Sequence, residues 1–150
     1  MTDVSYTLRS DVRRANVATI GIGEAGNVKK VAASKSVTAR TDGDTLKLLT
    51  LPSDARIHSG SKVYWDDLAS TGSPTMDIGI GPVDGNVTAD PDALLAGLDI
   101  ASAAGSSVLT TDHSEYGKML WELAGLSSDP GGEIDIYASF VDANTNTTGS

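Results

Sequence analysis

The segment GIGEAG at residues 21–26 has the G-x-G-x-x-G spacing of a loop that binds a dinucleotide cofactor. Such a site needs a strand before the loop, a long helix after it and an acidic residue about 20 positions further on. Residues 27–36 allow only about three helical turns, and the acids at that distance, Asp42 and Asp44, fall in a predicted turn. We therefore predict no cofactor and interpret the glycines as a hinge.

Nucleophilic catalysis would need a serine or cysteine beside a histidine. The chain has no cysteine, and His58 and His113 each stand alone in a polar stretch without a G-x-S-x-G motif nearby. Two acids could serve as the acid and base of a glycoside hydrolase, and pairs of acids are numerous. They include Asp66 with Asp67, Asp90 with Asp92, and Asp129 with Glu133. Only seven aromatic residues are available to line a sugar cleft. We therefore predict that the protein is not an enzyme.

Oxygen ligands for a hard cation such as Ca²⁺ gather in the middle of the chain. They are Asp77, Asp84, Asn86, Asp90, Asp92 and Asp99. The D-x-D-x-D-G spacing of an EF-hand is absent, and Asp84 and Asn86 flank a turn glycine. Asp90 precedes a proline, as the cap of a short helix would. We therefore predict no metal ion.

The 150 residues suffice for one domain with a single core. Residues 1–40 hold seven basic and three acidic side chains, a net charge of +4, whereas the other 110 hold four basic and 17 acidic ones, a net charge of −13. An acidic body repels nucleic acid and anionic lipid, so we predict neither nucleic acid nor membrane as a partner. The basic segment either docks on an acidic protein surface or is a solvated terminus. Without a secretion signal or an apolar run of about 20 residues, we expect synthesis and folding in the cytoplasm.

From residue 28 onward, short runs of β-branched and aromatic residues recur between turn signals, as in a β-sandwich or barrel. Residues 36–39 and 45–51 flank an Asp-Gly pair, which predicts an antiparallel hairpin. Strict alternation predicts strands over 76–80 and 134–141. The predicted core consists of Leu46, Leu48, Val63, Trp65, Met76, Ile78, Ile80, Leu120, Trp121, Leu123, Ile134, Ile136 and Phe140.

Capping residues and helical spacing predict two short helices, one over residues 90–97 and one over 112–123. The fold class is therefore mainly β: an antiparallel, jelly-roll-like β-sandwich with one or two short helices and an extended N-terminal arm. We divide the chain into a basic arm with a glycine hinge (1–27), a sandwich body (28–143) and a disordered tail (144–150).

Three stretches of the body form a familiar pattern: LPSDARI at 51–57, MDIGI with DGN at 76–86, and YGKMLWELAGLSSDPGGEIDIYASF at 116–140. In this order and spacing they resemble small virion proteins of tailed bacteriophages, which decorate or cement the capsid. The resemblance covers about residues 45–142. It implies a structural protein with a sandwich or jelly-roll-like body, often a homotrimer, that binds the major capsid protein on the outer surface of the virion after synthesis in the host cytoplasm.

The resemblance also implies an N-terminal extension that reaches along the shell, in the region where the chain is basic. We predict that the capsid-binding residues are Arg9, Arg13, Arg14, Lys29 and Lys30. The alternative, from another class, is a host-surface or glycan-binding module of a phage head or tail fibre. An exposed Trp65 or Trp121 would favour the alternative, whereas burial of both would favour a purely structural core.

Overall fold

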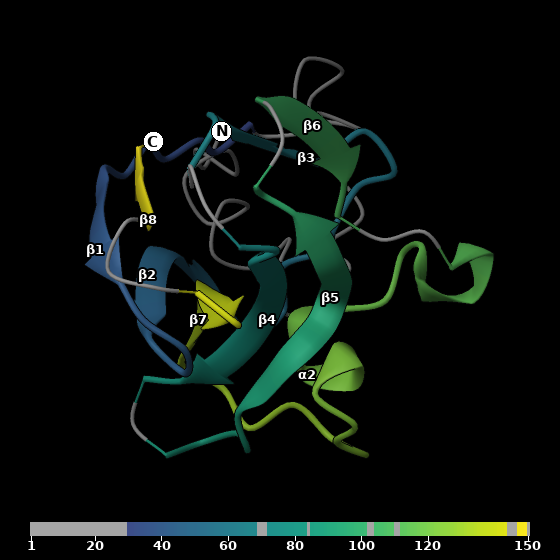
Figure 1. The fold of residues 1–150 in the computed structure, drawn as a ribbon. Helices are drawn as coiled ribbons and strands as arrows, with labels where there is room; N and C mark the ends of the chain where they lie inside the picture. Colours follow the sequence, from purple (N-terminus) through teal and green to yellow (C-terminus); the bar gives the residue numbers. More distant parts are fainter. Residues whose placement is uncertain are drawn as a thin grey trace, which may run out of the picture. The chain divides into compact units, whose positions relative to one another are not determined.

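The computed structural model describes residues 30–68, 72–83, 85–101, 104–109, 112–143 and 147–149. The chain divides into two compact units, Met1–Ala32 and Ala33–Ser150, and all strands and helices named here belong to the second (Figure 1). They are β1 (Val37–Arg40), β2 (Thr45–Pro52), β3 (Lys62–Trp65), β4 (Thr75–Pro82), β5 (Asp90–Asp99), β6 (Gly105–Val108), the 3₁₀ helix η1 (His113–Glu115), α2 (Leu120–Leu123), β7 (Glu133–Val141) and β8 (Thr147–Gly149). Within the described ranges, no helix has the length and apolar character to span a membrane.

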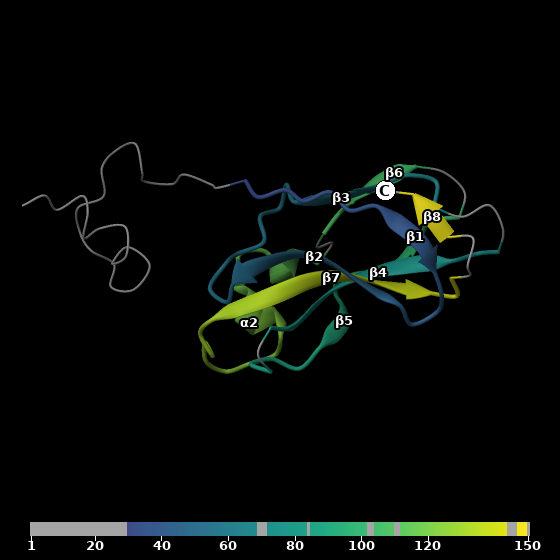
Figure 2. The same cartoon turned by 90° about the vertical axis from the view of Figure 1, so that its left-hand side faces the viewer.

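The strands form three antiparallel sheets. The largest has the order β2-β7-β4-β5, and the others are the pairs β1-β8 and β3-β6. Figure 2 shows the two small sheets on the same side of β7 and β4. The predicted mainly β, antiparallel fold with short helices is confirmed, while the jelly-roll order of strands and the arm remain predictions.

The strands predicted from strict alternation, β4 and β7, are confirmed and lie at the centre of the large sheet. On β4, Met76, Ile78 and Ile80 are at most 5% exposed, and the alternating residues of β7 from Ile134 to Phe140 are equally buried. Six of the thirteen predicted core residues lie on these two strands, while the leucines of β2 and both tryptophans pack against the buried core and stay partly buried. The alternation of apolar and polar residues predicted these strands correctly because one face of the large sheet is buried and the other is polar.

The helix predicted over residues 90–97 is wrong, because this segment is strand β5. It lies at the edge of the large sheet beside β4, so Pro91 can stand there without a backbone N–H to donate. Leu94 and Leu98 turn inward and are buried. Gly97, which resembled a helix stop, has a φ of +68° in a strand whose register with β4 is irregular.

The hairpin predicted around Asp42 and Gly43 is confirmed as a turn but wrong as a pairing. Gly43 has a φ of +81°, and the Asp44 N–H donates to the Thr41 carbonyl at 3.0 Å. The strands on either side then enter different sheets, since β1 pairs with β8 and β2 pairs with β7. The Gly43 N–H is bonded to the Phe140 carbonyl at 2.9 Å, so β7 takes the partner position beside the turn.

Residues 144–150 were predicted to be a disordered tail, and this is wrong for Thr147–Gly149. These residues form β8, with Val37 opposite Gly149 and Arg40 opposite Thr147. Low sequence complexity hid the strand, because a backbone ladder does not require apolar side chains. The second compact unit begins at Ala33.

The helix predicted over residues 112–123 is shorter and starts later than expected. Asp112 accepts a hydrogen bond from the Ser114 N–H at 2.8 Å, but only the 3₁₀ turn follows. Gly117, with a φ of +84°, interrupts the helical path. The capping box forms further along, where the Glu122 carboxylate accepts from the Met119 N–H at 2.7 Å and starts α2.

Candidate functional site

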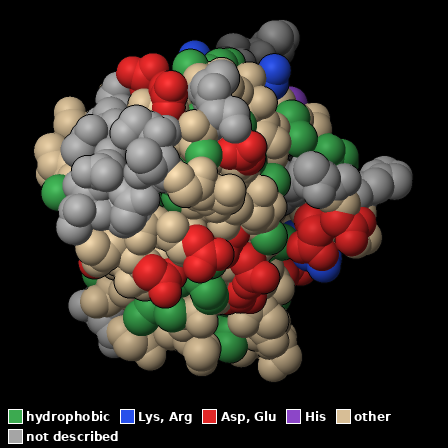
Figure 3. All heavy atoms as spheres, in the orientation of Figure 1, with side chains coloured by type: hydrophobic (Ala, Val, Ile, Leu, Met, Phe, Trp, Pro, Cys, Tyr) green, Lys and Arg blue, Asp and Glu red, His purple; other side chains and the backbone are tan. Residues whose placement is uncertain are grey.

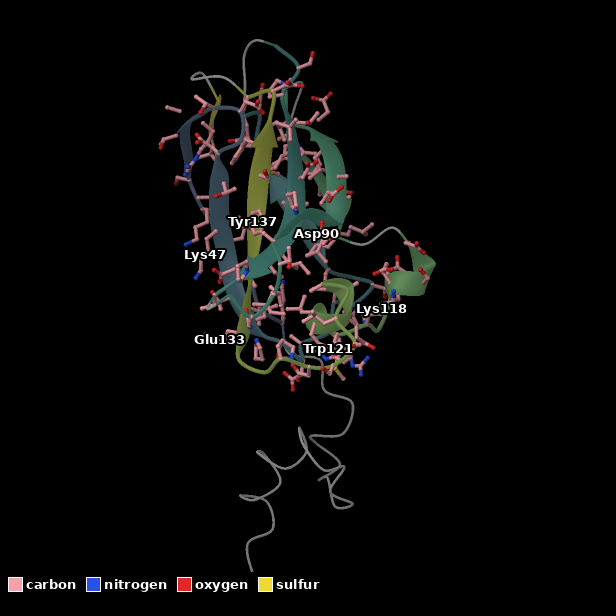
Figure 4. The ribbon with its side chains drawn as sticks, turned by 90° about the horizontal axis from the view of Figure 1, so that it is seen from below. Lys47, Asp90, Lys118, Trp121, Glu133 and Tyr137 are labelled. Carbon is pink, nitrogen blue, oxygen red and sulfur yellow. The ribbon has the colours of Figure 1, made fainter. Side chains whose placement is uncertain are left out.

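The outward face of the large sheet gathers the polar side chains of its strands, and we call it the polar face. The register places Lys47 of β2, Tyr137 of β7 and Gly79 of β4 in one row across the sheet. Asp90 of β5 lies beyond them (Figure 4). Figure 3 shows Asp and Glu side chains gathered over the front of β4 and β5. The polar face is therefore one candidate binding surface among the described residues.

The two glycines of β4 on the polar face are required by packing. A Cβ at Gly79 would lie 2.2 Å from the Asp90 carbonyl oxygen and 2.4 Å from the carbonyl carbon of Pro91. A Cβ at Gly81 would lie 2.9 Å from Cε1 of Tyr137, so the tyrosine ring covers the bare backbone there. The space above these glycines is therefore filled by β5 and by Tyr137.

Two groups on the polar face have raised pKa values, the carboxyl of Asp90 and the hydroxyl of Tyr137, and Asp92 contributes to both shifts. Burial raises the pKa of the Asp90 carboxyl, and the hydrogen bond and negative charge of the Asp92 side chain raise it further, against a backbone hydrogen bond from Asp92 that lowers it. Burial also raises the pKa of the Tyr137 hydroxyl, with the charges of Asp90 and Asp92 adding to the effect. These surroundings therefore favour the protonated form of Asp90 more than water does.

The Asp90→Asn variant is expected to be more stable than the wild type at neutral pH. A carboxyl whose pKa is raised by folding contributes its full stability below the ordinary carboxyl pKa and loses it as the pH rises through the folded value. At pH 7 the ionised Asp90 therefore opposes folding, and the neutral amide removes the repulsion from Asp92. We expect a Tm higher by roughly 1–2 °C, the size typical of mostly exposed charges.

Thermal unfolding at pH 7 and pH 3 measures this effect, with Asp67→Asn in the exposed loop after β3 as the control. The gain of Asp90→Asn should vanish at pH 3, where the wild-type carboxyl is protonated. A gain of the same size at both pH values would contradict the electrostatic explanation.

At the β2 edge of the polar face, opposite β5, side chains of β2 bind a carboxylate of β7. They are Lys47 and Thr50, and the carboxylate is that of Asp135. Lys47 Nζ lies 2.9 Å from Asp135 Oδ1, and the Thr50 hydroxyl donates to the same oxygen. The Lys47 side chain is 56% exposed and that of Asp135 18% exposed. The carboxylate is thus occupied by β2 and joins the edge strand to β7.

Two of the oxygen-bearing residues considered for Ca²⁺, Asp77 and Asn86, are hydrogen-bonded to backbone groups. Asp77 accepts from the Gly97 N–H at 2.6 Å, and the Asn86 amide donates to the Glu133 carbonyl at 2.9 Å. Asp84 lies outside the described residues. In the part of the chain that the structure describes, no group of three or more His, Cys, Asp or Glu side chains could hold a metal ion.

Most of the predicted capsid-binding residues lie outside the described residues, namely Arg9, Arg13, Arg14 and Lys29, as do the hinge glycines. Lys30 is described and exposed. Its position leaves the ammonium available to a partner.

Both tryptophans pack against the core and are partly buried. The Trp121 indole N–H donates to Met119 Sδ at 3.1 Å. Trp65 lies over Gly105, where a Cβ would be 2.6 Å from the ring. On this criterion the glycan-binding alternative gains no support from either tryptophan.

Sequence reasoning assigned no role to Tyr64, which is 71% exposed on β3. The signal was available in the alternation of the strand, because Val63 and Trp65 turn inward while Lys62 and Tyr64 turn outward. An aromatic residue on the outward positions of a short strand is a candidate contact residue.

No protein-family model, curated protein or solved structure matches the chain.

Proposed function

We propose that the protein is a structural component of a tailed-bacteriophage virion that binds the outer surface of the capsid and stabilises the mature head. In this proposal it acts without catalysis, its partner is the major capsid protein, and it assembles as a homo-oligomer on the capsid surface. The proposal is supported by the three stretches that resemble head decoration proteins and by the way the fold joins them.

The observation that carries the proposal is that these three stretches pack on one another. The Leu120 N–H donates to the Ala55 carbonyl at 2.9 Å, and the Trp121 N–H donates to the Ser53 carbonyl at 3.2 Å, which ties the first stretch to α2. The Ser53 hydroxyl donates to Asp129 at 2.6 Å. The second stretch pairs with the third along the whole β4–β7 ladder. A pattern spread over about 100 residues thus describes one packed unit.

The charges of the chain support a proposal in which the first 40 residues bind the capsid and the remaining residues contribute less to that contact. The basic residues of the first 40 positions suit an acidic capsid surface, whereas residues 41–150, with their net charge of −13, are repelled by such a surface except where their own face is complementary. A protein that binds several capsid subunits at once stabilises the assembled shell by mass action, because the separated subunits offer it fewer contacts. Oligomerisation would add avidity.

Deleting residues 2–16 is expected to weaken attachment to phage heads that lack this protein. The deletion removes Arg9, Arg13 and Arg14, so we expect affinity to fall by roughly tenfold and to depend less on salt. Binding is measured by co-sedimentation with the heads at several salt concentrations.

A full-length variant with all three arginines changed to glutamine separates charge from length. It should behave like the deletion, while unfolding of the body stays unchanged in both. Equal occupancy and equal salt dependence for wild type and deletion would remove the arm from the proposal. A wild-type protein that binds no heads would overturn the proposed function.

A further inference from the structure

The outer face of the β3–β6 sheet differs from the rest of the body surface. Burial alternates along β3, with Lys62 and Tyr64 exposed. Ser106 lies opposite Tyr64 and is exposed, and Val108 lies opposite Lys62. Tyr64 has the highest exposure, 71%, among the exposed large hydrophobic side chains of the described residues. We call these four residues the β3–β6 face.

The backbone beneath Tyr64 is held firmly in place. β3 and β6 pair over four consecutive positions, and the Leu109 N–H extends the contact by donating to the Ser61 carbonyl at 3.0 Å. On the inner side, the ring of Trp65 packs on Gly105 and against the core. A partner that covers Tyr64 therefore does not have to order the backbone beneath it.

The charge of the β3–β6 face is opposite to that of the body. The two strands contain one charged residue, Lys62, and no carboxylate. Lys47 and Lys118 are paired with Asp135 and Glu115, whereas Lys62 makes no ion pair with another described residue. The carboxylates of Asp66 and Asp67 follow β3 directly and mark the border of the face.

We propose that the β3–β6 face is the surface through which the body docks on an acidic protein surface. Tyr64 is the central apolar contact, and Lys62 supplies the ion pair to a carboxylate of the partner. Tyrosine is enriched among the residues that dominate binding energy. Because residues 41–150 carry a net charge of −13, an acidic partner is repelled least by a face that has no carboxylates of its own. This inference rests on the proposed function, in which the acidic surface belongs to the capsid.

The test uses the full-length protein and phage heads assembled without it. Tyr64→Ala should weaken binding by about 30-fold or more, the effect of losing a central contact. Lys62→Glu should weaken it by about tenfold and reduce its salt dependence. Tyr64→Phe should bind nearly as well as wild type, because the ring is retained. Tyr116→Ala, which truncates another partly exposed tyrosine, is the matched control.

Unfolding of each variant is measured in parallel, and Lys62→Glu decides the question if Tyr64→Ala fails to fold. If wild type binds the heads and both Tyr64→Ala and Lys62→Glu bind as tightly as Tyr116→Ala, the β3–β6 face is not the docking surface while the proposed function stands. If wild type itself does not bind, the proposed function fails, and the inference fails with it.

Discussion

Changing Gly79 to alanine is expected to destabilise the protein by about 3 kcal/mol and to lower the Tm by about 10 °C. The new Cβ would lie 2.2 Å from the Asp90 carbonyl oxygen and 2.4 Å from the Pro91 carbonyl carbon. Both atoms belong to backbone, so no side-chain rotation relieves the clash. The start of β5 must move away from β4, and the packing of Leu94 behind it is disturbed.

Gly60→Ala is the matched control for this substitution. A Cβ at Gly60 would meet only His58 Nδ1, at an ordinary 3.5 Å. Both variants reduce the flexibility of the unfolded chain equally, so the difference between their midpoints in urea reports the clash. Equal stability of the two variants would show that β5 does not cross Gly79 closely.

Changing Phe140 to alanine should cost about 3–5 kcal/mol, the range for removing a buried aromatic ring. Phe140 is fully buried in β7, opposite Met76 of β4. Its backbone also bonds to Gly43 and Asp44 at the start of β2. The side chain is therefore surrounded where three strands meet, and neighbours held by these ladders cannot close the cavity.

Phe140→Leu provides the graded comparison, with an expected cost below about 1.5 kcal/mol because most of the volume is retained. Urea unfolding of both variants gives the two free energies. A loss of less than 1 kcal/mol for Phe140→Ala would mean that the core around β7 is loosely packed.

The central strands β4 and β7 were predictable because the pattern that identifies them lies within each strand's own sequence. Along β4 and β7 the alternation of apolar and polar residues reports directly which side chains are buried. β5 was mistaken for a helix because its signals, a capping Asp90, Pro91 and a terminal Gly97, fit both a helix and an irregular edge strand. Only the position beside β4 distinguishes the two, and that position depends on residues far along the chain.

The candidate site was less predictable than the fold. Asp90 and Asp92 were visible as a pair in the sequence, but their relation to Tyr137, more than 40 residues away, comes from the order of strands. β8 gave no signal, since its threonines and glycine pair through the backbone. Which distant strands pair depends on all the strands that could pair with each of them. A short stretch of sequence does not contain that information.

The β1–β8 pair has a consequence for the way the body is made. β1 ends at Arg40, and its partner strand begins at Thr147, so β1 stays without its ladder until more than 100 further residues have been synthesised. The large sheet needs residues only as far as Val141 and can form earlier. Closing so long a loop is slow and entropically costly. During synthesis, the last strand of the large sheet is therefore complete before the strand that pairs with β1.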